Sequence, residues 1–276
     1  MAALMESPPL VDRVLELLDL LSGHPGGMSL TEICRQQSIP KAAAYRALSA
    51  LVRNGFVEQD AASEWYRLTL KTTTIGLRYL AEIGITEICQ PVIDRLAAKT
   101  EELVRLVVAN DDTLIWVAKT QGALSGLRYD PDMGQAVVLH ATAAGRAWLS
   151  TLDEDEAVRI VMERGFSVPA RFYRRLITNE ASLRAELRAT RERGYGLAIE
   201  EGAAGTAAIA VPIFNALEKQ NRAVGTVSVA GPVVRMTQAR IAEIMPDVRA
   251  AAVELSQIWP VRRFLDAESL RRVSNR

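Results

Sequence analysis

The stretch "SIPKAAAYRALSALVRNGF", residues 38–56, is typical of a single amphipathic helix that has Pro40 in its first turn and ends near Asn54 and Gly55. On a 3.6-residue period, one side carries small and branched apolar residues and is predicted to pack on neighbouring helices: Ala44, Ala47, Leu48 and Leu51. The other side carries Lys41, Ala42, Tyr45, Arg46, Ser49 and Arg53. This outer side can be read either as an ordinary solvated face or as a surface that contacts DNA.

The charge around this helix favours the second interpretation. No Asp or Glu occurs from Ile33 to Val57, whereas the same stretch holds four basic residues: Arg35, Lys41, Arg46 and Arg53. The whole chain is balanced, with 33 basic and 33 acidic residues, so a solvated face would be expected to carry both signs. A basic stretch without acids is what a surface facing phosphates needs.

The flanking segments predict a winged helix-turn-helix. Apolar residues at helical spacing predict a first helix within residues 11–24: Val11, Val14, Leu15, Leu18 and Leu21. "SLTEICRQQS" predicts a short second helix, with Ser29 as N-cap and Glu32 three residues later. "FVEQ" and "WYRL" predict a hairpin that ends near Leu70.

In this order the third helix is the recognition helix, and its N-terminal half faces the major groove. The predicted DNA contacts are Ser29, Thr31, Lys41, Ala42, Ala43, Tyr45, Arg46, Ser49 and Arg53. Among them, Arg46 can donate two hydrogen bonds to a guanine edge, and Tyr45 can reach a phosphate or a thymine methyl group.

Residues 71–100 are strongly helical, with interruptions expected at Gly84 and Pro91. Strand-like segments follow at 103–110, 113–120, 124–130, 195–200, 206–214 and 223–231, and helical segments at 142–152, 153–165, 182–194 and 237–259. This mixture predicts an α+β fold with an antiparallel sheet. The predicted divisions are a DNA-binding domain at 8–70, a linker helix at 71–85, a second domain at 86–262 and a tail at 263–276.

Several classes of protein and site are disfavoured by the composition. Cys34 and Cys89 lie far apart without CxxC spacing, and His24 and His140 are the only histidines, so we expect no disulfide framework, metal site or cofactor. The start of the chain lacks the pattern of a signal peptide, and no apolar run approaches the ~18 residues of a membrane span. We therefore expect a cytoplasmic protein.

A ligand site is suggested by "LHATAAGR", residues 139–146, which predicts a strand end, Thr142 as N-cap and a helix of very small residues. Free N–H groups at Ala143, Ala144 and Gly145 would accommodate a carboxylate. Hydroxyl groups of Thr206, Ser228 and Thr226 could add donors. The alternative is that these small residues only allow the helix to pack closely on the sheet.

Five blocks of sequence, in this order, resemble the IclR family of bacterial transcriptional regulators over nearly the whole chain. They are "SLTEICRQQSIPKAAAYRALSALVRNGFVEQD", "WYRL", "LHATAAGRAWLS", "RERGYGLAIEEGAAGTAAIAVPIF" and "GTVSVAGPVVRMT". The resemblance implies an N-terminal winged helix-turn-helix, a helical linker and a C-terminal effector-binding domain of GAF-like fold. It also implies homodimers formed through the DNA-binding domains, often homotetramers, and repression or activation controlled by a small metabolite, commonly a carboxylic or aromatic acid.

The resemblance carries an effector site over to Val137, Ala143, Ala144, Gly145, Ala198, Thr206, Ala208, Ser228 and Ala230. Ala198, Ala208 and Ala230 replace residues that are commonly acidic, Cys and Ser in the family, which predicts a larger and less polar site. Ala42 and Ala43 replace the usual Ser and Thr of the recognition helix, so more of the DNA contact is expected from Lys41, Tyr45, Arg46 and Arg53.

Other residues allow two interpretations each. His140 is either a ligand contact or a buried structural histidine. Trp116 and Trp148 are either core residues or walls of an effector site, and Arg128 and Tyr129 could reach a carboxylate.

The sequence thus predicts a transcription factor that binds double-stranded operator DNA and itself, under the control of a small organic acid that is aromatic or medium-sized. The alternatives are an enzyme on a GAF-like fold and a regulator whose second domain binds no ligand and serves only in assembly.

Overall fold

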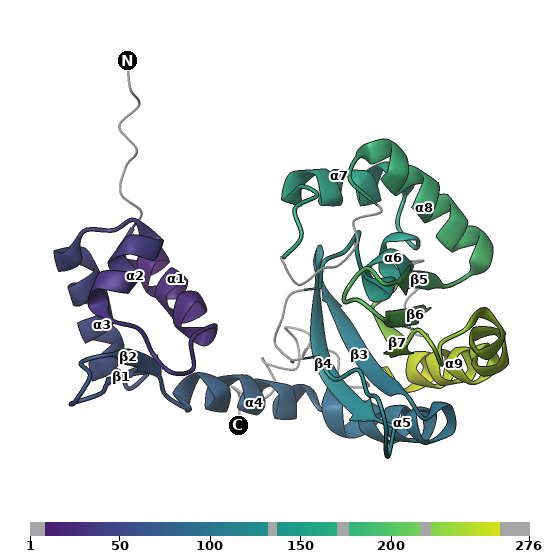
Figure 1. The fold of residues 1–276 in the computed structure, drawn as a ribbon, viewed down its shortest axis with the longest axis horizontal. Helices are drawn as coiled ribbons and strands as arrows, with labels where there is room; N and C mark the ends of the chain where they lie inside the picture. Colours follow the sequence, from purple (N-terminus) through teal and green to yellow (C-terminus); the bar gives the residue numbers. More distant parts are fainter. Residues whose placement is uncertain (1–8, 132–136, 170–176, 216–221, 260–276) are drawn as a thin grey trace, which may run out of the picture. The chain divides into compact units, whose positions relative to one another are not determined.

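The computed structural model describes residues 9–131, 137–169, 177–215 and 222–259 (Figure 1). The chain divides into two compact units, Met1–Glu82 and Ile83–Arg276, which are described separately. The predicted tail at 263–276 lies outside the described residues.

The first unit contains three helices, a hairpin and a fourth helix. They are α1 (Leu10–Ser22), α2 (Leu30–Gln37), α3 (Lys41–Arg53), β1 (Val57–Gln59), β2 (Tyr66–Leu68) and α4 (Lys71–Ile83). Both α1 and α2 contact α3, and β1 pairs antiparallel with β2. The predicted winged helix-turn-helix is therefore confirmed.

Local interactions set the ends of α2 and α3. The hydroxyl oxygen of Ser29 accepts a hydrogen bond from the Glu32 N–H group at 3.2 Å, as expected of an N-cap. Ser38, with φ of 53°, ends α2, and Gly55, with φ of 72°, follows the end of α3. Both residues adopt the left-handed conformation that commonly terminates a helix.

The second unit is a five-stranded sheet with helices on both faces. Its elements are α5 (Ile85–Thr100), β3 (Leu103–Asn110), β4 (Thr113–Gln121), α6 (Ala143–Leu149), α7 (Glu154–Arg164), α8 (Glu180–Arg193), β5 (Gly196–Ile199), β6 (Thr206–Ile213), β7 (Gly225–Pro232) and α9 (Gln238–Ile258). The strand order is β4-β3-β7-β6-β5, and each neighbouring pair is antiparallel. The predicted α+β class with an antiparallel sheet is confirmed.

The two faces of this sheet bury different helices. α6 packs on β5, β6 and β7, whereas α5 and α9 pack against each other and against strands of the same sheet (Figure 1). The α6 face has a core that includes Val107, Trp148, Leu149, Ile160 and Leu187. Because side chains alternate along a strand, every second residue of β3, β6 and β7 points towards α6.

Three expectations for local structure are wrong. Residues 124–130 form a loop instead of a strand: Leu124 is 96% exposed, Gly126 has φ of 77°, and the side chains of Arg235 and Gln121 bind the carbonyl groups of Leu127 and Tyr129. α5 runs through Pro91, so the helical segment is interrupted only at Gly84, where φ is 71°. The residues just before Thr142 form a turn, not the end of a strand.

None of the helices in the described ranges has the length and apolar character needed to cross a lipid bilayer.

Candidate functional site

The outer side of α3 exposes basic and small side chains on the surface of the first unit. Lys41, Ala42, Tyr45, Arg46 and Arg53 are exposed. Within the described part of the chain, no carboxylate forms an ion pair with the lysine or with either of these two arginines. Their charges are therefore available to a polyanion.

Three of the predicted DNA contacts, Ser49, Thr31 and Ser29, differ in how available their hydroxyl groups are. Ser49 is half-buried, and Thr31 on α2 is exposed. The hydroxyl of Ser29 already accepts the N–H group of Glu32, so its oxygen serves as the α2 cap.

Ala43 corrects one prediction, because its side chain is only 4% exposed and belongs to the buried residues of α3 together with Ala44 and Ala47. A methyl group buried between helices cannot reach a thymine. Ala43 is therefore a packing residue, and Ala42 is the exposed member of the pair.

The strand pairing gathers most of the predicted effector residues on one face of the sheet. Ala198 pairs with Ala208, and Ala208 pairs with Ala230, so these three alanines form a row across β5, β6 and β7. Ser228 lies two residues before Ala230 and so points to the same side. Ala143 and Ala144, both buried, begin the helix α6 that packs on these strands.

The backbone groups at the start of α6 are less available than expected. Thr142 is the N-cap, as predicted, and its hydroxyl oxygen accepts the Gly145 N–H group at 3.1 Å. One of the three N–H groups predicted to be free is therefore occupied. The hydroxyl of Thr206 donates to the carbonyl of Ala203 at 2.7 Å, so it is also used within the chain.

Glycines allow α6 to lie very close to the sheet and to the preceding turn. A Cβ atom added to Gly145 would overlap the backbone of Leu139, and one added to Gly196 would overlap the carbonyl oxygen of Ala143. The interpretation of the small residues as packing residues therefore holds at these two glycines.

A buried ion pair beneath α6 was not anticipated from the sequence. Arg146 donates to both carboxylate oxygens of Glu201, and both side chains are almost fully buried. Arg146 also donates to the carbonyl oxygens of His140 and Leu197. Burial raises the pKa of the Glu201 carboxyl above its usual value, although Arg146 opposes this shift. The arginine thus joins α6, the preceding turn and β5.

A second arginine that the sequence did not single out lies on the same face of the sheet. Arg105 on β3 pairs directly with Ser228 on β7, and its guanidinium carbon lies 3.7 Å from the ring centroid of Trp116 and 5.9 Å from that of Tyr129. The only sequence signal was a charged residue in the middle of the apolar strand "LVRLVV".

The remaining predicted residues separate into core and surface positions. His140 is buried with its ring 5.4 Å from that of Phe166, and burial together with the charge of Arg146 lowers its pKa. Trp148 is fully buried and its Nε1–H group donates to the carbonyl of Ala223, which makes it a core residue.

The two other positions differ in exposure. Val137 is buried, whereas Arg128 is exposed.

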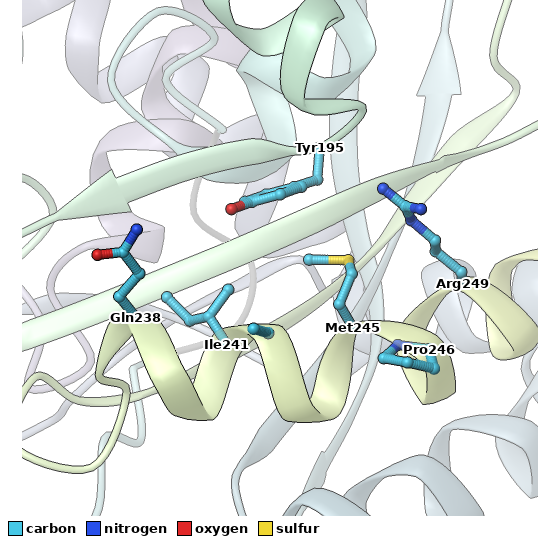
Figure 2. A pocket seen from close by; sticks show the side chains of 7 residues that line it. Tyr195, Gln238, Ile241, Met245, Pro246 and Arg249 are labelled. Atoms are coloured by element: carbon cyan, nitrogen blue, oxygen red, sulfur yellow. The ribbon is translucent and has the colours of Figure 1, made fainter.

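A separate hollow of about 550 Å³ lies beside α9 (Figure 2). Tyr195 lies over the helix, from which Gln238, Ile241, Met245, Pro246 and Arg249 project. None of the predicted effector residues lines this hollow. Its lining is mainly apolar, and the guanidinium of Arg249 is bonded to the carbonyl of Arg193 at its edge.

Comparisons with known proteins agree with this arrangement. Residues 10–61 match the model of the IclR helix-turn-helix domain, and residues 77–257 match the model of the C-terminal region of the bacterial transcriptional regulator IclR. The chain is 28% identical to the probable transcriptional regulator SauR of Cupriavidus necator, over 88% of this chain and 94% of the relative. It is 26% identical to the transcriptional repressor IclR of Escherichia coli, over 88% and 87% of the two chains.

Solved structures show the same fold. The crystal structure of an IclR transcriptional regulator from Alicyclobacillus acidocaldarius has a TM-score of 0.76 and 26% identity, covering 91% of this chain and 98% of that one. An IclR homologue from Microbacterium hydrocarbonoxydans, solved in complex with 4-hydroxybenzoate, has a TM-score of 0.68 and 19% identity, covering 90% and 98%.

Proposed function

This chain belongs to the IclR family of bacterial transcriptional regulators, and from that premise we propose that a small carboxylic acid controls its binding to operator DNA. The protein is a DNA-binding transcriptional regulator. The acid is aromatic or of medium size, is linked to catabolism, and binds between α6 and the strands β5, β6 and β7. The DNA is bound by α3 through Lys41, Tyr45, Arg46 and Arg53, with Ala42, Ser49, Ser29 and Thr31 at the same surface.

The observation that carries the ligand site is the row formed by Ala198, Ala208 and Ala230 beneath the start of α6. Three methyl groups leave an apolar floor, and Ser228 adds a hydroxyl group beside it. An aromatic or aliphatic body fits such a floor better than a very small polar acid does. The same fold in the Microbacterium homologue holds 4-hydroxybenzoate, which supports an aromatic acid as the type of ligand.

The test uses a labelled DNA fragment taken from upstream of the operon that neighbours the gene of this protein. The fluorescence anisotropy of the fragment is measured with the full-length protein. Benzoate, 4-hydroxybenzoate and hexanoate are expected to change the apparent affinity for this fragment, in the direction of either release or tighter binding. An affinity that none of the acids changes, for a fragment that the protein binds specifically, would overturn the ligand proposal and leave the DNA-binding function intact.

Two rival functions make different predictions. A regulator whose second unit only assembles would show no ligand-induced thermal stabilisation, whereas a ligand at about 100 times its dissociation constant adds roughly 2.7 kcal/mol. An enzyme would turn over the bound acid, which product analysis by mass spectrometry would detect. For a metal-dependent enzyme, the described residues offer no group of three or more His, Cys, Asp or Glu that is arranged to hold a metal ion.

We also propose self-association in the bacterial cytoplasm, as a homodimer that can pair into a dimer of dimers. Large apolar side chains are exposed on α1 and α4: Leu10, Val11, Leu15, Ile75, Leu77 and Tyr79. Such groupings of exposed apolar side chains mark protein interfaces. In this proposal residues 8–70 bind DNA, residues 71–85 form the linker and residues 86–262 form the effector domain.

A further inference from the structure

Arg105 is a cation within the sheet of the second unit for which the described residues supply no carboxylate partner. It is half-buried on β3, its Nε–H group is buried, and among the described residues no acceptor lies within hydrogen-bonding distance of that nitrogen. No ion pair links its guanidinium to a carboxylate in the same part of the chain. Burial disfavours the charged guanidinium and lowers the pKa of Arg105 to about 10.

Two other arginines that stack on aromatic rings show what is missing at Arg105. Arg193 lies 5.7 Å from the ring centroid of Tyr195 and pairs with Glu186 at 2.7 Å. Arg222 lies 5.0 Å from the ring centroid of Trp148 and pairs with Asp112 and Glu156. Arg105 has the closest stack of the three, at 3.7 Å from the centroid of Trp116, but apart from this stack and that of Tyr129 it has no carboxylate partner among the described residues.

A second unpartnered polar group lies on the same side of the neighbouring strand. Arg105 pairs with Ser228, and Thr226 lies two residues before Ser228, so all three side chains point towards α6. The hydroxyl of Thr226 is buried and has no hydrogen-bond partner among the described residues. Buried polar groups are normally satisfied, so two unpartnered groups on one face of the sheet call for an explanation, and a ligand that supplies the missing partners is one.

The surroundings define the chemistry of that ligand. The row of Ala198, Ala208 and Ala230 lies on the same face of the sheet and offers apolar area. It reaches the polar groups because Ala230 follows Ser228 by two residues on β7. The neighbouring cation, Lys119 on β4, is already paired with Asp130 at 2.7 Å. Among the described residues, Arg105 supplies one positive charge without a carboxylate partner here, which suits a monoanion, because a dianionic phosphate would need further cations.

We propose that Arg105 is the anion anchor of the effector site, and that the effector is a monocarboxylate on an apolar body whose carboxylate pairs with the guanidinium stacked on Trp116. This inference rests on the proposed function, since it takes the face between α6 and the sheet as the effector site. Thr226 donates its hydroxyl hydrogen to the same carboxylate. The site therefore selects the ionised acid over its neutral amide.

The test measures binding of four probes to the full-length protein by calorimetry: benzoate, hexanoate, benzamide and inorganic phosphate. The variants are Arg105→Gln, which removes the charge, and Arg105→Lys, which keeps a charge without the planar fork. Arg222→Gln is the matched control, because Arg222 is also stacked on a tryptophan but has its own carboxylate partners. Affinity for operator DNA without ligand and the thermal midpoint are measured for each variant.

For the native protein we expect benzoate or hexanoate to bind, and benzamide to bind at least about tenfold more weakly than benzoate. Arg105→Gln should weaken carboxylate binding about tenfold or more, leave benzamide binding unchanged and leave ligand-free DNA affinity unchanged. Its thermal midpoint should not fall, since the variant removes a half-buried charge that has no carboxylate partner among the described residues. Arg105→Lys should retain part of the carboxylate affinity, and Arg222→Gln should retain all of it.

Each other result overturns the inference in a distinguishable way. Equal carboxylate affinity of the native protein and Arg105→Gln rejects the anchor, while ligand-dependent DNA binding would still support the effector site. Phosphate binding that depends on Arg105 and exceeds carboxylate binding rejects the ligand class. Absence of carboxylate binding to the native protein rejects both the anchor and the proposed effector control, and leaves the DNA-binding function standing.

Discussion

At the scale of single residues, Arg46 is the side chain of α3 best suited to contact a base. It is exposed, it projects from the second turn of the helix, and no carboxylate pairs with it among the described residues. A guanidinium that binds a guanine edge with two hydrogen bonds contributes about 1–3 kcal/mol of discrimination. Contacts to phosphate, in contrast, add affinity without sequence preference.

Replacing Arg46 with Ala should therefore weaken specific operator binding by about 1–3 kcal/mol and relax the preference at one base position. Anisotropy titrations against the operator and a set of single-base variants measure both effects. Arg35→Ala is the control, because Arg35 lies in the same acid-free stretch but pairs with Glu32 at 2.8 Å. Equal losses for the two variants would argue against a base contact by Arg46.

The buried pair of Arg146 and Glu201 gives a second prediction at this scale. Arg146→Met leaves the Glu201 carboxylate buried without its partner, so the free energy of unfolding should fall by about 3–5 kcal/mol. Replacing both residues, as in Arg146→Met with Glu201→Met, should be less destabilising than the single change, because no uncompensated charge remains. Denaturant unfolding measures the two values. A double variant less stable than the single variant would contradict this account.

At the scale of elements, Glu154 connects the first turn of α7 to α8. Its carboxylate accepts hydrogen bonds from Arg184, Arg188 and Arg191, three arginines along one side of α8. The bonds from Arg188 and Arg184 lower the pKa of Glu154 from 4.5 to about 2. Since the folded-state pKa lies below the unfolded value, the carboxylate stabilises the folded state at pH values above 4.5.

The effect of Glu154→Gln should therefore depend on pH. The variant should be less stable than the native protein at neutral pH, and the difference should shrink as the pH falls from 4.5 towards 2. Denaturant unfolding across this range measures the difference. The control is Glu163→Gln on the same helix, because Glu163 is more exposed and contacts only Arg159 among the described residues. A pH-independent effect of Glu154→Gln would show that the arginine contacts do not stabilise this helix pair.

The close contact between α6 and β5 requires a glycine at position 196. Gly196→Ala would place a methyl group against the carbonyl oxygen of Ala143, so α6 must shift or the strand must bend. Gly202→Ala is a suitable control, since its added Cβ would meet only the Tyr129 hydroxyl at 3.9 Å. We expect the first variant to lower the thermal midpoint and weaken benzoate binding, and the second to change neither. Native-like midpoints and affinities for both variants would reject a tight α6 contact.

At the scale of the whole molecule, the exposed apolar residues of α1 are the feature that a single chain leaves unexplained. Leu15 is 58% exposed on a helix whose other side buries Leu17 and Leu21. Exposed apolar area of this kind costs free energy in water and is removed by association. A dimer formed through the first units would bury it and would present two recognition helices to two half-sites.

Leu15→Glu should therefore lower the association state in sedimentation experiments and weaken binding to a full operator more than binding to a half-site. Val253→Glu on α9 is the control, because Val253 is equally exposed, at 58%, but lies in the second unit. An unchanged association state for Leu15→Glu would exclude α1 as the dimer surface.

The sequence alone determined the features that depend on neighbours along the chain. The inner face of α3, the Ser29 cap and the Thr142 cap were all predicted, because they follow from helical periodicity and from hydrogen bonds across three residues. The strands of the hairpin and of the sheet were largely predicted as well, because strand propensity and the turn residues that bound each segment are also local signals. The error at residues 124–130 arose because strand propensity cannot show that no partner strand lies alongside.

Only the tertiary structure decided which distant residues meet. The side chain of Ala43 is buried because the buried face of α3 includes Ala43 as well as Ala44, which helical periodicity alone did not predict. Arg146 meets Glu201 across 55 positions, and the strand register sets Arg105 opposite Ser228 across 123 positions. Such pairings depend on chain topology and strand register, which no local pattern encodes. The exposed basic side of α3 could therefore be located from the sequence, whereas Arg105, the proposed anion anchor, could be located only from the fold.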